Sequence, residues 1–249
     1  MKQNPQLLIV PDEDFEYGIS HGAYPEFKEE LKTGEVVVVS RDNATTEYGL
    51  SSPKENKIYV RNIFDGTYQD ITAEDTEKAF IKAKAVAIRE VLVMLGAYTA
   101  ELEHQITHAQ EKDLKIGATG KKGLDSVGVS YHQNRHKELN LTAIIKLNPF
   151  NRSAKDSHAI REYIYTHGLG NESTLVAWVQ RLERDGKLEG PEEIEVSFLE
   201  ELTAARDAAL NLQIVQSEVG FNIESLYKET HQFVEKISVN FSCPTQGNE

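Results

Sequence analysis

The chain has 249 residues, with 27 lysines and arginines against 40 aspartates and glutamates, which gives a formal net charge of −13. Because duplex DNA must be met by clustered cations, this charge argues against DNA as a partner. Its apolar content of 39 % is ordinary for a soluble globular protein with a core. The single cysteine, Cys243, excludes an intrachain disulfide. Since no apolar signal-peptide run follows Met1, we expect a reducing, cytoplasmic location.

The first seventy residues predict three strands, at 6–10, 35–40 and 57–64. The run of valines from Glu35 to Ser40 is continuous and β-branched, which indicates a strand buried on both faces. The connections are predicted as an acidic loop at 12–17, a short helix at 25–32 and a polar, turn-rich stretch at 41–57.

The strongest helical pattern covers residues 73–95. It follows Thr72, which with Asp75 resembles a capping box, and it stops at Gly96. Two adjacent apolar stripes recur at steps of three and four residues: Phe80, Ala83, Ala87, Val91 and Met94, and Ile81, Ala85, Ile88, Leu92 and Leu95. Five charged residues interrupt the run, which therefore falls short of the ~18 apolar residues of a membrane span: Lys78, Lys82, Lys84, Arg89 and Glu90. The pattern predicts a long, buried core helix.

After Gly96 the apolar period changes to two, which predicts a strand near 98–106 and a polar loop at 117–123. The alternation resumes over 127–131 and 139–147. Residues 132–138 belong either to one long projecting strand or to a turn between two strands, and the turn is slightly favoured. Segment 97–147 is thus predicted as a long β-hairpin.

Beyond Pro149 the pattern becomes mainly helical. It predicts helices at 156–167, 173–184, 200–215 and 222–235, and strands at 193–198 and 237–241. Strands come in groups rather than alternating with helices, so we expect an α+β fold with a mainly antiparallel sheet around the 73–95 helix. We expect a single domain over 1–249, with the best candidate for a seam at 148–151 and a disordered tail at 244–249.

Charge is unevenly distributed, because segment 97–147 holds seven cations against six anions in an otherwise acidic chain. The cations near the predicted hairpin tip and strands are candidates for contact with a membrane or a partner: Lys112, Lys115, Lys121, Lys122, Arg135 and Lys137. Four histidines in the same segment are candidates for pH sensitivity: His104, His108, His132 and His136. The ordinary alternative is that these charges only solvate exposed strands and a loop tip.

Each candidate motif for catalysis or ligand binding fails on residue type or geometry. The loop Gly117–Gly123 lacks the first glycine and the hydroxyl of a phosphate-binding loop. Ser130 and His132 lie in an alternating strand rather than at the sharp turn that a serine nucleophile requires. Histidines four apart on a strand lie about 13 Å apart, too far to bind one metal ion. A pairing of His132 with His104 or His108 across two strands would lack the further ligands of a tetrahedral site.

Helix, turn and helix over 157–198 resemble the arrangement of a DNA-reading element, but residues 155–195 hold five cations against nine anions, which is wrong for groove entry. We therefore predict no catalytic residues, cofactor or metal. The leading hypothesis is a non-enzymatic protein that associates with itself or with a protein partner, because long strands leave edges that need cover. One alternative is a membrane-binding or pore-forming protein that uses segment 97–147 on anionic lipid. Another is an enzyme with a site dispersed through the sequence.

Overall fold

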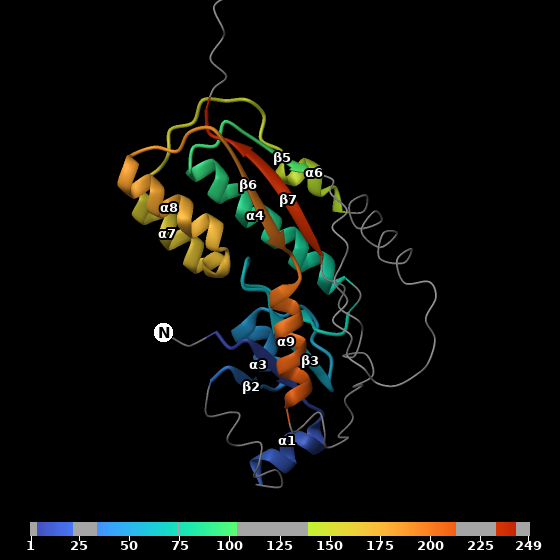
Figure 1. Cartoon of the computed structure of the whole chain (residues 1–249). Helices are drawn as coiled ribbons and strands as arrows, with labels where there is room; N and C mark the ends of the chain where they lie inside the picture. The colour runs from blue at the N-terminus through green and yellow to red at the C-terminus, as the bar shows by residue number, and fades with distance from the viewer. Residues whose placement is uncertain (1–3, 22–33, 74, 104–138, 213–232, 243–249) are drawn as a thin grey trace, which may run out of the picture. The chain divides into compact units, whose positions relative to one another are not determined.

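The computed structural model describes residues 4–21, 34–73, 75–103, 139–212 and 233–242 (Figure 1). The chain divides into two compact units, each treated by itself below. Unit 1 comprises residues 1–79 and 200–230, and unit 2 comprises residues 80–199 and 231–249. The candidate seam at 148–151 lies inside unit 2, and the single-domain hypothesis stays a prediction.

Unit 1 is built on a four-stranded mixed sheet in the order β2-β1-β3-β4. Strands β1 (Leu7–Val10) and β2 (Val36–Val38) are parallel, while β3 (Lys57–Arg61) is antiparallel to both β1 and β4 (Tyr68–Asp70). The predicted strands of this half are thus confirmed, and β4 was missed. Its three residues, all half-buried, are too few to show an alternating pattern.

Helices α1 (Glu13–Ser20), α3 (Arg41–Tyr48) and α9 (Glu200–Asn211) also belong to unit 1. The predicted loop at 12–17 is wrong, because Asp12 accepts a hydrogen bond from the Phe15 amide and starts a helix. Residues 41–48 are also helical rather than turn-rich. Ser40 caps α3 and Gly49 ends it in the left-handed conformation. The predicted helix at 25–32 lies outside the described residues.

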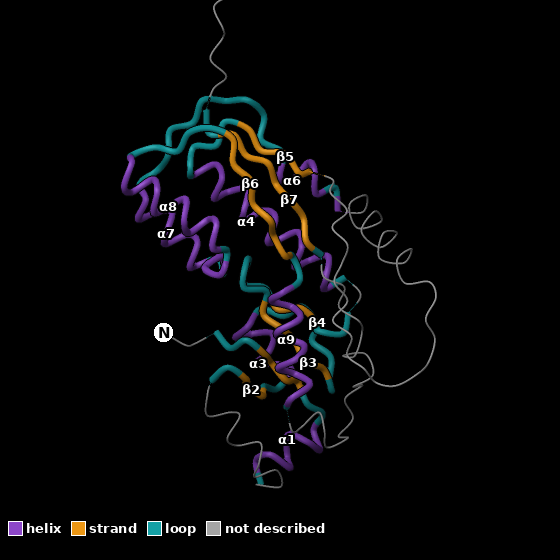
Figure 2. Tube along the Cα trace, in the orientation of Figure 1, coloured by secondary structure: helices purple, strands orange, loops and turns teal. Residues whose placement is uncertain are grey.

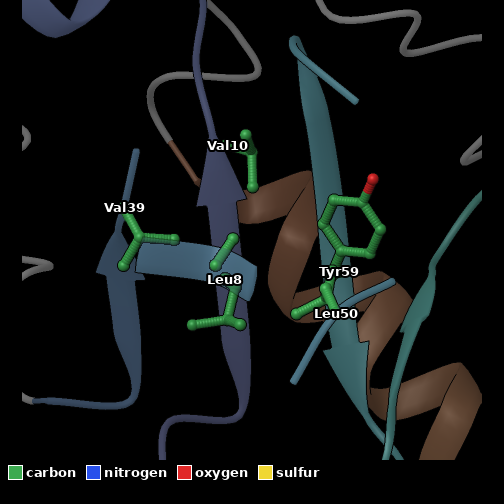
Figure 3. Packing of buried hydrophobic residues seen from close by; sticks show 6 residues of the cluster. Leu8, Val10, Val39, Leu50 and Tyr59 are labelled. Carbon is green, nitrogen blue, oxygen red and sulfur yellow. The ribbon is translucent and has the colours of Figure 1, made fainter. Parts of the chain in front are cut away.

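One hydrophobic cluster lies against the central strands of this sheet (Figure 3). Leu8 and Val10 of β1 pack with Tyr59 of β3, and α3 with its flanking residues adds Val39, Ala44 and Leu50. All six are at most 8 % exposed. Because Ala44 is the only buried residue of α3, this helix has almost no apolar period, so its sequence predicts a polar, turn-rich stretch instead of a helix.

Unit 2 is built on a three-stranded antiparallel sheet, β5-β7-β6, with strands β5 (Thr99–Glu103), β6 (Pro191–Ser197) and β7 (Val234–Asn240). In the central row Ile237 pairs with Leu102 on one side and with Ile194 on the other, and all three are buried. Figure 2 shows the sheet with β7 between its neighbours. Residues 234–235, predicted as the end of a helix, begin β7. Residue 233 of that predicted helix is not helical, and residues 222–232 lie outside the described residues.

The long helix α4 (Thr76–Met94) begins in unit 1 and continues in unit 2. Its apolar stripes are buried as predicted except at Ala83, which is half-buried, and Gly96 follows the helix at φ +82°. The start lies three residues later than predicted, because the Ala73 amide and the Thr76 hydroxyl both bond the carbonyl of Asp70 and form a turn. Helices α7 (Ser157–Thr166) and α8 (Ser173–Asp185) lie side by side, joined by the short 3-10 turn η1 (Leu169–Asn171).

The second strand of the predicted hairpin is wrong at residues 139–147. Residues Leu141–Ile145 form the short helix α6, and only Leu147 pairs with β5, at Ala100. Leu141 and Ile145 are both fully buried. A spacing of four satisfies a helical face and a strand face equally, so the alternation at this position was ambiguous. No helix among the described residues is long and apolar enough to cross a membrane.

Candidate functional site

Strand β2 stands at one edge of the unit 1 sheet, and β4 stands at the other. The Leu7 amide donates to Glu35 O at 3.0 Å, and the Val39 amide donates to Ile9 O at 3.0 Å. Since successive residues of a strand point their backbone groups to opposite sides, Val37 also bonds β1. Val36 and Val38 therefore direct their N–H and C=O groups away from the sheet. Among the described strands, none pairs with this side of β2.

The expected burial of β2 on both faces is only partly correct. Val36 is buried, but Val37 and Val38 are half-buried, because β2 stands at the end of the sheet instead of between two strands. A continuous apolar run is therefore present on an edge strand. No charged residue lies within Val36–Val38.

The outer strands of unit 2 differ from β2. Strand β6 begins with Pro191 and carries Glu192, Glu193 and Glu195, which are devices that keep an edge from pairing with another chain. The outer side of β5 is partly occupied, because the Leu147 amide donates to Ala100 O at 2.9 Å. Among these edges, β2 is apolar and carries neither proline nor charge.

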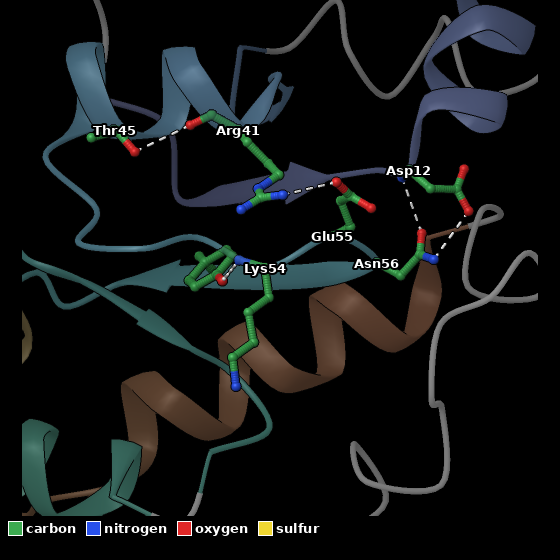
Figure 4. Close-up of polar contacts among 7 residues, drawn as sticks. Asp12, Arg41, Thr45, Lys54, Glu55 and Asn56 are labelled. Carbon is green, nitrogen blue, oxygen red and sulfur yellow. Dashed lines mark hydrogen bonds and ion pairs between the residues drawn. The ribbon is translucent and has the colours of Figure 1, made fainter.

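A polar cluster lies where β1 and β2 end and β3 begins, the edge of a parallel pair at which α/β sheets often bind ligands (Figure 4). Asp12 and Asn56 bond each other twice: the Asp12 amide donates to Asn56 Oδ1 at 3.2 Å, and Asn56 Nδ2 donates to Asp12 Oδ2 at 3.0 Å. The Phe15 amide, and then Asn56, hold the pKa of Asp12 below its usual value. Arg41 pairs with Glu55 at 3.2 Å. These groups satisfy one another and the helix start, so the cluster serves the fold.

Tyr68 and Asp70, both in strand β4 of the β3–β4 hairpin, have shifted pKa values. Burial raises the pKa of Tyr68 to about 12, with a smaller opposing effect from Arg61. Burial alone would raise the pKa of Asp70, but hydrogen bonds from Thr72 and the nearby Lys57 outweigh it, and the pKa is lowered. Lys57 Nζ lies 3.0 Å from Asp70 Oδ2. Both groups bind local partners, and we assign them a structural role.

The open face of the unit 2 sheet carries paired charges. The register sets Glu101, Ser238 and Glu193 in one row and Glu103, Lys236 and Glu195 in the next. Lys236 Nζ lies 2.6 Å from Glu193 Oε2 and 3.7 Å from Glu103 Oε2, and Ser238 donates to Glu103. Glu193 and then Glu103 raise the pKa of Lys236. Such a face is what an antiparallel sheet with one solvated side shows.

Among the described residues, two ion pairs have largely buried side chains, one in each unit. In unit 2, Lys84 Nζ lies 2.7 Å from Glu172 Oε1 and donates to Ser197 O at 2.6 Å. In unit 1, Arg206 Nη1 donates to Glu77 Oε1 at 3.0 Å. Buried pairs of this kind hold elements in one arrangement and are weak evidence for stability or for catalysis.

All ten residues predicted as contact or pH-sensitive sites lie in 104–138, outside the described residues: Lys112, Lys115, Lys121, Lys122, Arg135, Lys137, His104, His108, His132 and His136. Their assignments stay predictions. Within the part of the chain that the structure describes, no three His, Cys, Asp or Glu side chains are placed to hold a metal ion. The exposed edge at β2 was missed, because the same apolar run fits a central strand.

The chain matches no protein-family model, no curated protein and no solved structure.

Proposed function

We propose that this chain acts without catalysing a reaction, by associating with itself or with another protein through strand addition at β2. The supporting observation is the contrast between edges: β2 presents the outward backbone groups of Val36 and Val38 on an uncharged valine run, whereas β6 carries proline and three glutamates. An apolar, uncharged edge is the kind that accepts another strand. The expected location of this association is the cytoplasm.

Valine side chains favour the addition as well. Val37 and Val38 are half-buried, so part of each side chain remains for a neighbouring strand to cover. Cross-strand pairs of β-branched residues stabilise a sheet by roughly 0.2–1 kcal/mol each relative to alanine. Addition at this edge would therefore gain both main-chain hydrogen bonds and apolar burial.

The test is the association state of the full chain and of Val38→Pro, measured by sedimentation velocity over a wide range of protein concentration. The amide of Val38 points outward, so proline there removes an edge donor and leaves the bonds to β1 intact. We expect the unmodified chain to associate with rising concentration and Val38→Pro to stay monomeric.

Val38→Ala is the matched control, because it shortens the same side chain and keeps the amide. We expect it to associate almost as the unmodified chain does, and Val38→Lys, which adds like charge to the edge, to resemble Val38→Pro. Equal thermal midpoints would show that each variant is folded. Association that is unchanged in folded Val38→Pro would refute the β2 edge as the contact.

The membrane alternative stays a prediction: α6 replaces part of the second predicted strand, and residues 104–138 of the predicted hairpin lie outside the described residues. No arrangement among the described residues favours the enzyme alternative, which stays a prediction.

A further inference from the structure

We infer that the strand added at β2 is β2 of a second copy of this chain, antiparallel and centred on Val37. This inference depends on the proposed function and specifies its partner and register. Two identical strands related by a closing twofold axis must run antiparallel, because the axis reverses the direction of the strand. Both copies then present the same edge to each other.

The phase of the backbone fixes the register. Only Val36 and Val38 direct their N–H and C=O groups outward, since Glu35 and Val39 bond β1. Setting Val36 opposite Val38 of the second copy makes two hydrogen-bonded pairs, which together use all four outward groups of each strand. A slip by one residue would place outward groups against the inward groups of Val37 and lose these bonds.

A shift of the register by two residues keeps outward groups opposite outward groups, but it pairs fewer residues of β2 with each other. Such shifts would pair Val36 with itself and Val38 with residue 34, or Val38 with itself and Val36 with residue 40, and both partners lie outside β2. In the centred register every residue of the three-residue strand faces a valine, and no charges meet. Pairing β6 with β6 of a second copy about a twofold axis would instead bring two glutamate-rich strands together, and their like charges would repel.

The expected assembly is one continuous sheet in which β2 of each copy lies next to β2 of the other. Because the shared strand is only three residues long, the contact area is small, and we expect a weak dimer that forms at high protein concentration. Val37 faces Val37 of the second copy as a non-hydrogen-bonded pair, with Cβ atoms about 4.5–5.5 Å apart.

Cysteine cross-linking tests this register in the full chain. Cys243→Ser removes the native thiol, and Val37→Cys, Val38→Cys or Val36→Cys is then added to that parent. Under mild oxidation at a concentration where the parent associates, Val37→Cys should form a reducible dimer, since its thiols lie within reach of a disulfide. Val38→Cys alone should not, because two residues 38 lie about 8 Å apart between their Cα atoms in this register, beyond the ~7 Å limit.

Mixing Val36→Cys with Val38→Cys provides the second positive result, since these positions face each other and should form a mixed dimer. Cross-linking of Val38→Cys alone, or of none of the variants while the parent still associates, would overturn the centred antiparallel register. If the register is overturned in this way but Val38→Pro still abolishes association, the proposed strand addition at β2 remains supported. A parent that remains monomeric at every concentration would refute self-association itself.

Discussion

Asp12 and Asn56, 44 residues apart in sequence, form a reciprocal pair of hydrogen bonds. The backbone amide of Asp12 donates to the side-chain oxygen of Asn56, and the side-chain nitrogen of Asn56 donates to the carboxylate of Asp12. The pair joins the start of α1 to the start of β3, and Asp12 also caps α1 through the Phe15 amide. Asn56 has φ +55°, in the left-handed region, where asparagine and glycine are the favoured residues. One asparagine thus holds a turn and a helix start together.

Replacing Asn56 should separate its backbone role from its side-chain role. Asn56→Gly keeps the left-handed turn and loses both hydrogen bonds, for a loss of about 1 kcal/mol in the free energy of unfolding. Asn56→Ala also places a Cβ in the left-handed region, which adds roughly 1–2 kcal/mol. Urea unfolding followed by circular dichroism measures both variants. Equal losses in the two variants would show that backbone strain does not contribute at this turn.

Gly96 should tolerate alanine much less well than Gly186. Both have positive φ, +82° and +74°, but a Cβ on Gly96 would lie 3.0 Å from Ala154 N and 3.1 Å from Arg152 O. A Cβ on Gly186 would have no atom within 4 Å. We expect Gly186→Ala to cost about 1 kcal/mol for the backbone alone, and Gly96→Ala to cost a further ~1–3 kcal/mol because two backbone segments must separate.

The fluorescence of Trp178 reports this comparison directly, since Trp178 lies in α8 of the same unit and is the sole tryptophan. A similar loss of unfolding free energy in Gly96→Ala and Gly186→Ala would contradict the close approach of residues 152–154 to the end of α4.

The Lys84–Glu172 pair should show strong coupling. The Lys84 side chain is fully buried, so Glu172→Gln leaves a buried ammonium without its carboxylate and should cost about 3–5 kcal/mol. Lys84→Met in the same chain removes that buried charge. The double variant Lys84→Met with Glu172→Gln should therefore be more stable than Glu172→Gln alone. The test is a double-mutant cycle on urea unfolding read by Trp178 fluorescence, and losses that simply add would refute the coupling.

Tyr68 should titrate apart from ordinary tyrosines. Its hydroxyl donates to Pro5 O at 2.7 Å, and burial raises its pKa to about 12. The difference in absorbance at 295 nm between the chain and Tyr68→Phe should contain one tyrosinate with a midpoint about two units above the usual ~10.

The raised pKa of Tyr68 makes the free energy of unfolding depend on pH. The pKa of Tyr68 is higher in the folded than in the unfolded protein. The contribution of its hydroxyl to the free energy of unfolding is therefore fully present below pH ~10 and is lost as pH rises through about 12. Unfolding free energy should thus fall less steeply over this range in Tyr68→Phe. Identical slopes in the two proteins would show that the Tyr68 hydroxyl does not titrate differently in the fold.

Local sequence signals predicted the elements that carry their own pattern. The two apolar stripes and Gly96 predict the body and the end of α4, though not its start, and the alternation of Ala100 and Leu102 predicts β5. Ser40 and Gly49 were equally clear boundaries for α3, yet its single buried residue left no period to recognise. The spacing of Leu141 and Ile145 fits a helix and a strand equally, so the predicted strand is wrong at this position.

For the candidate site, the composition of the valine run was evident but its position in the sheet was not. A strand of valines looks the same at the centre of a sheet and at its edge, because burial of its second face depends on which strand pairs beside it. That pairing brings Leu7 next to Val36 and next to Val60, residues far apart in the chain. The sequence by itself determined where apolar and polar residues alternate, since this period reflects local backbone geometry. Only the tertiary structure decided that β2 is an edge, because strand order is set by long-range backbone hydrogen bonds that local side-chain patterns do not encode.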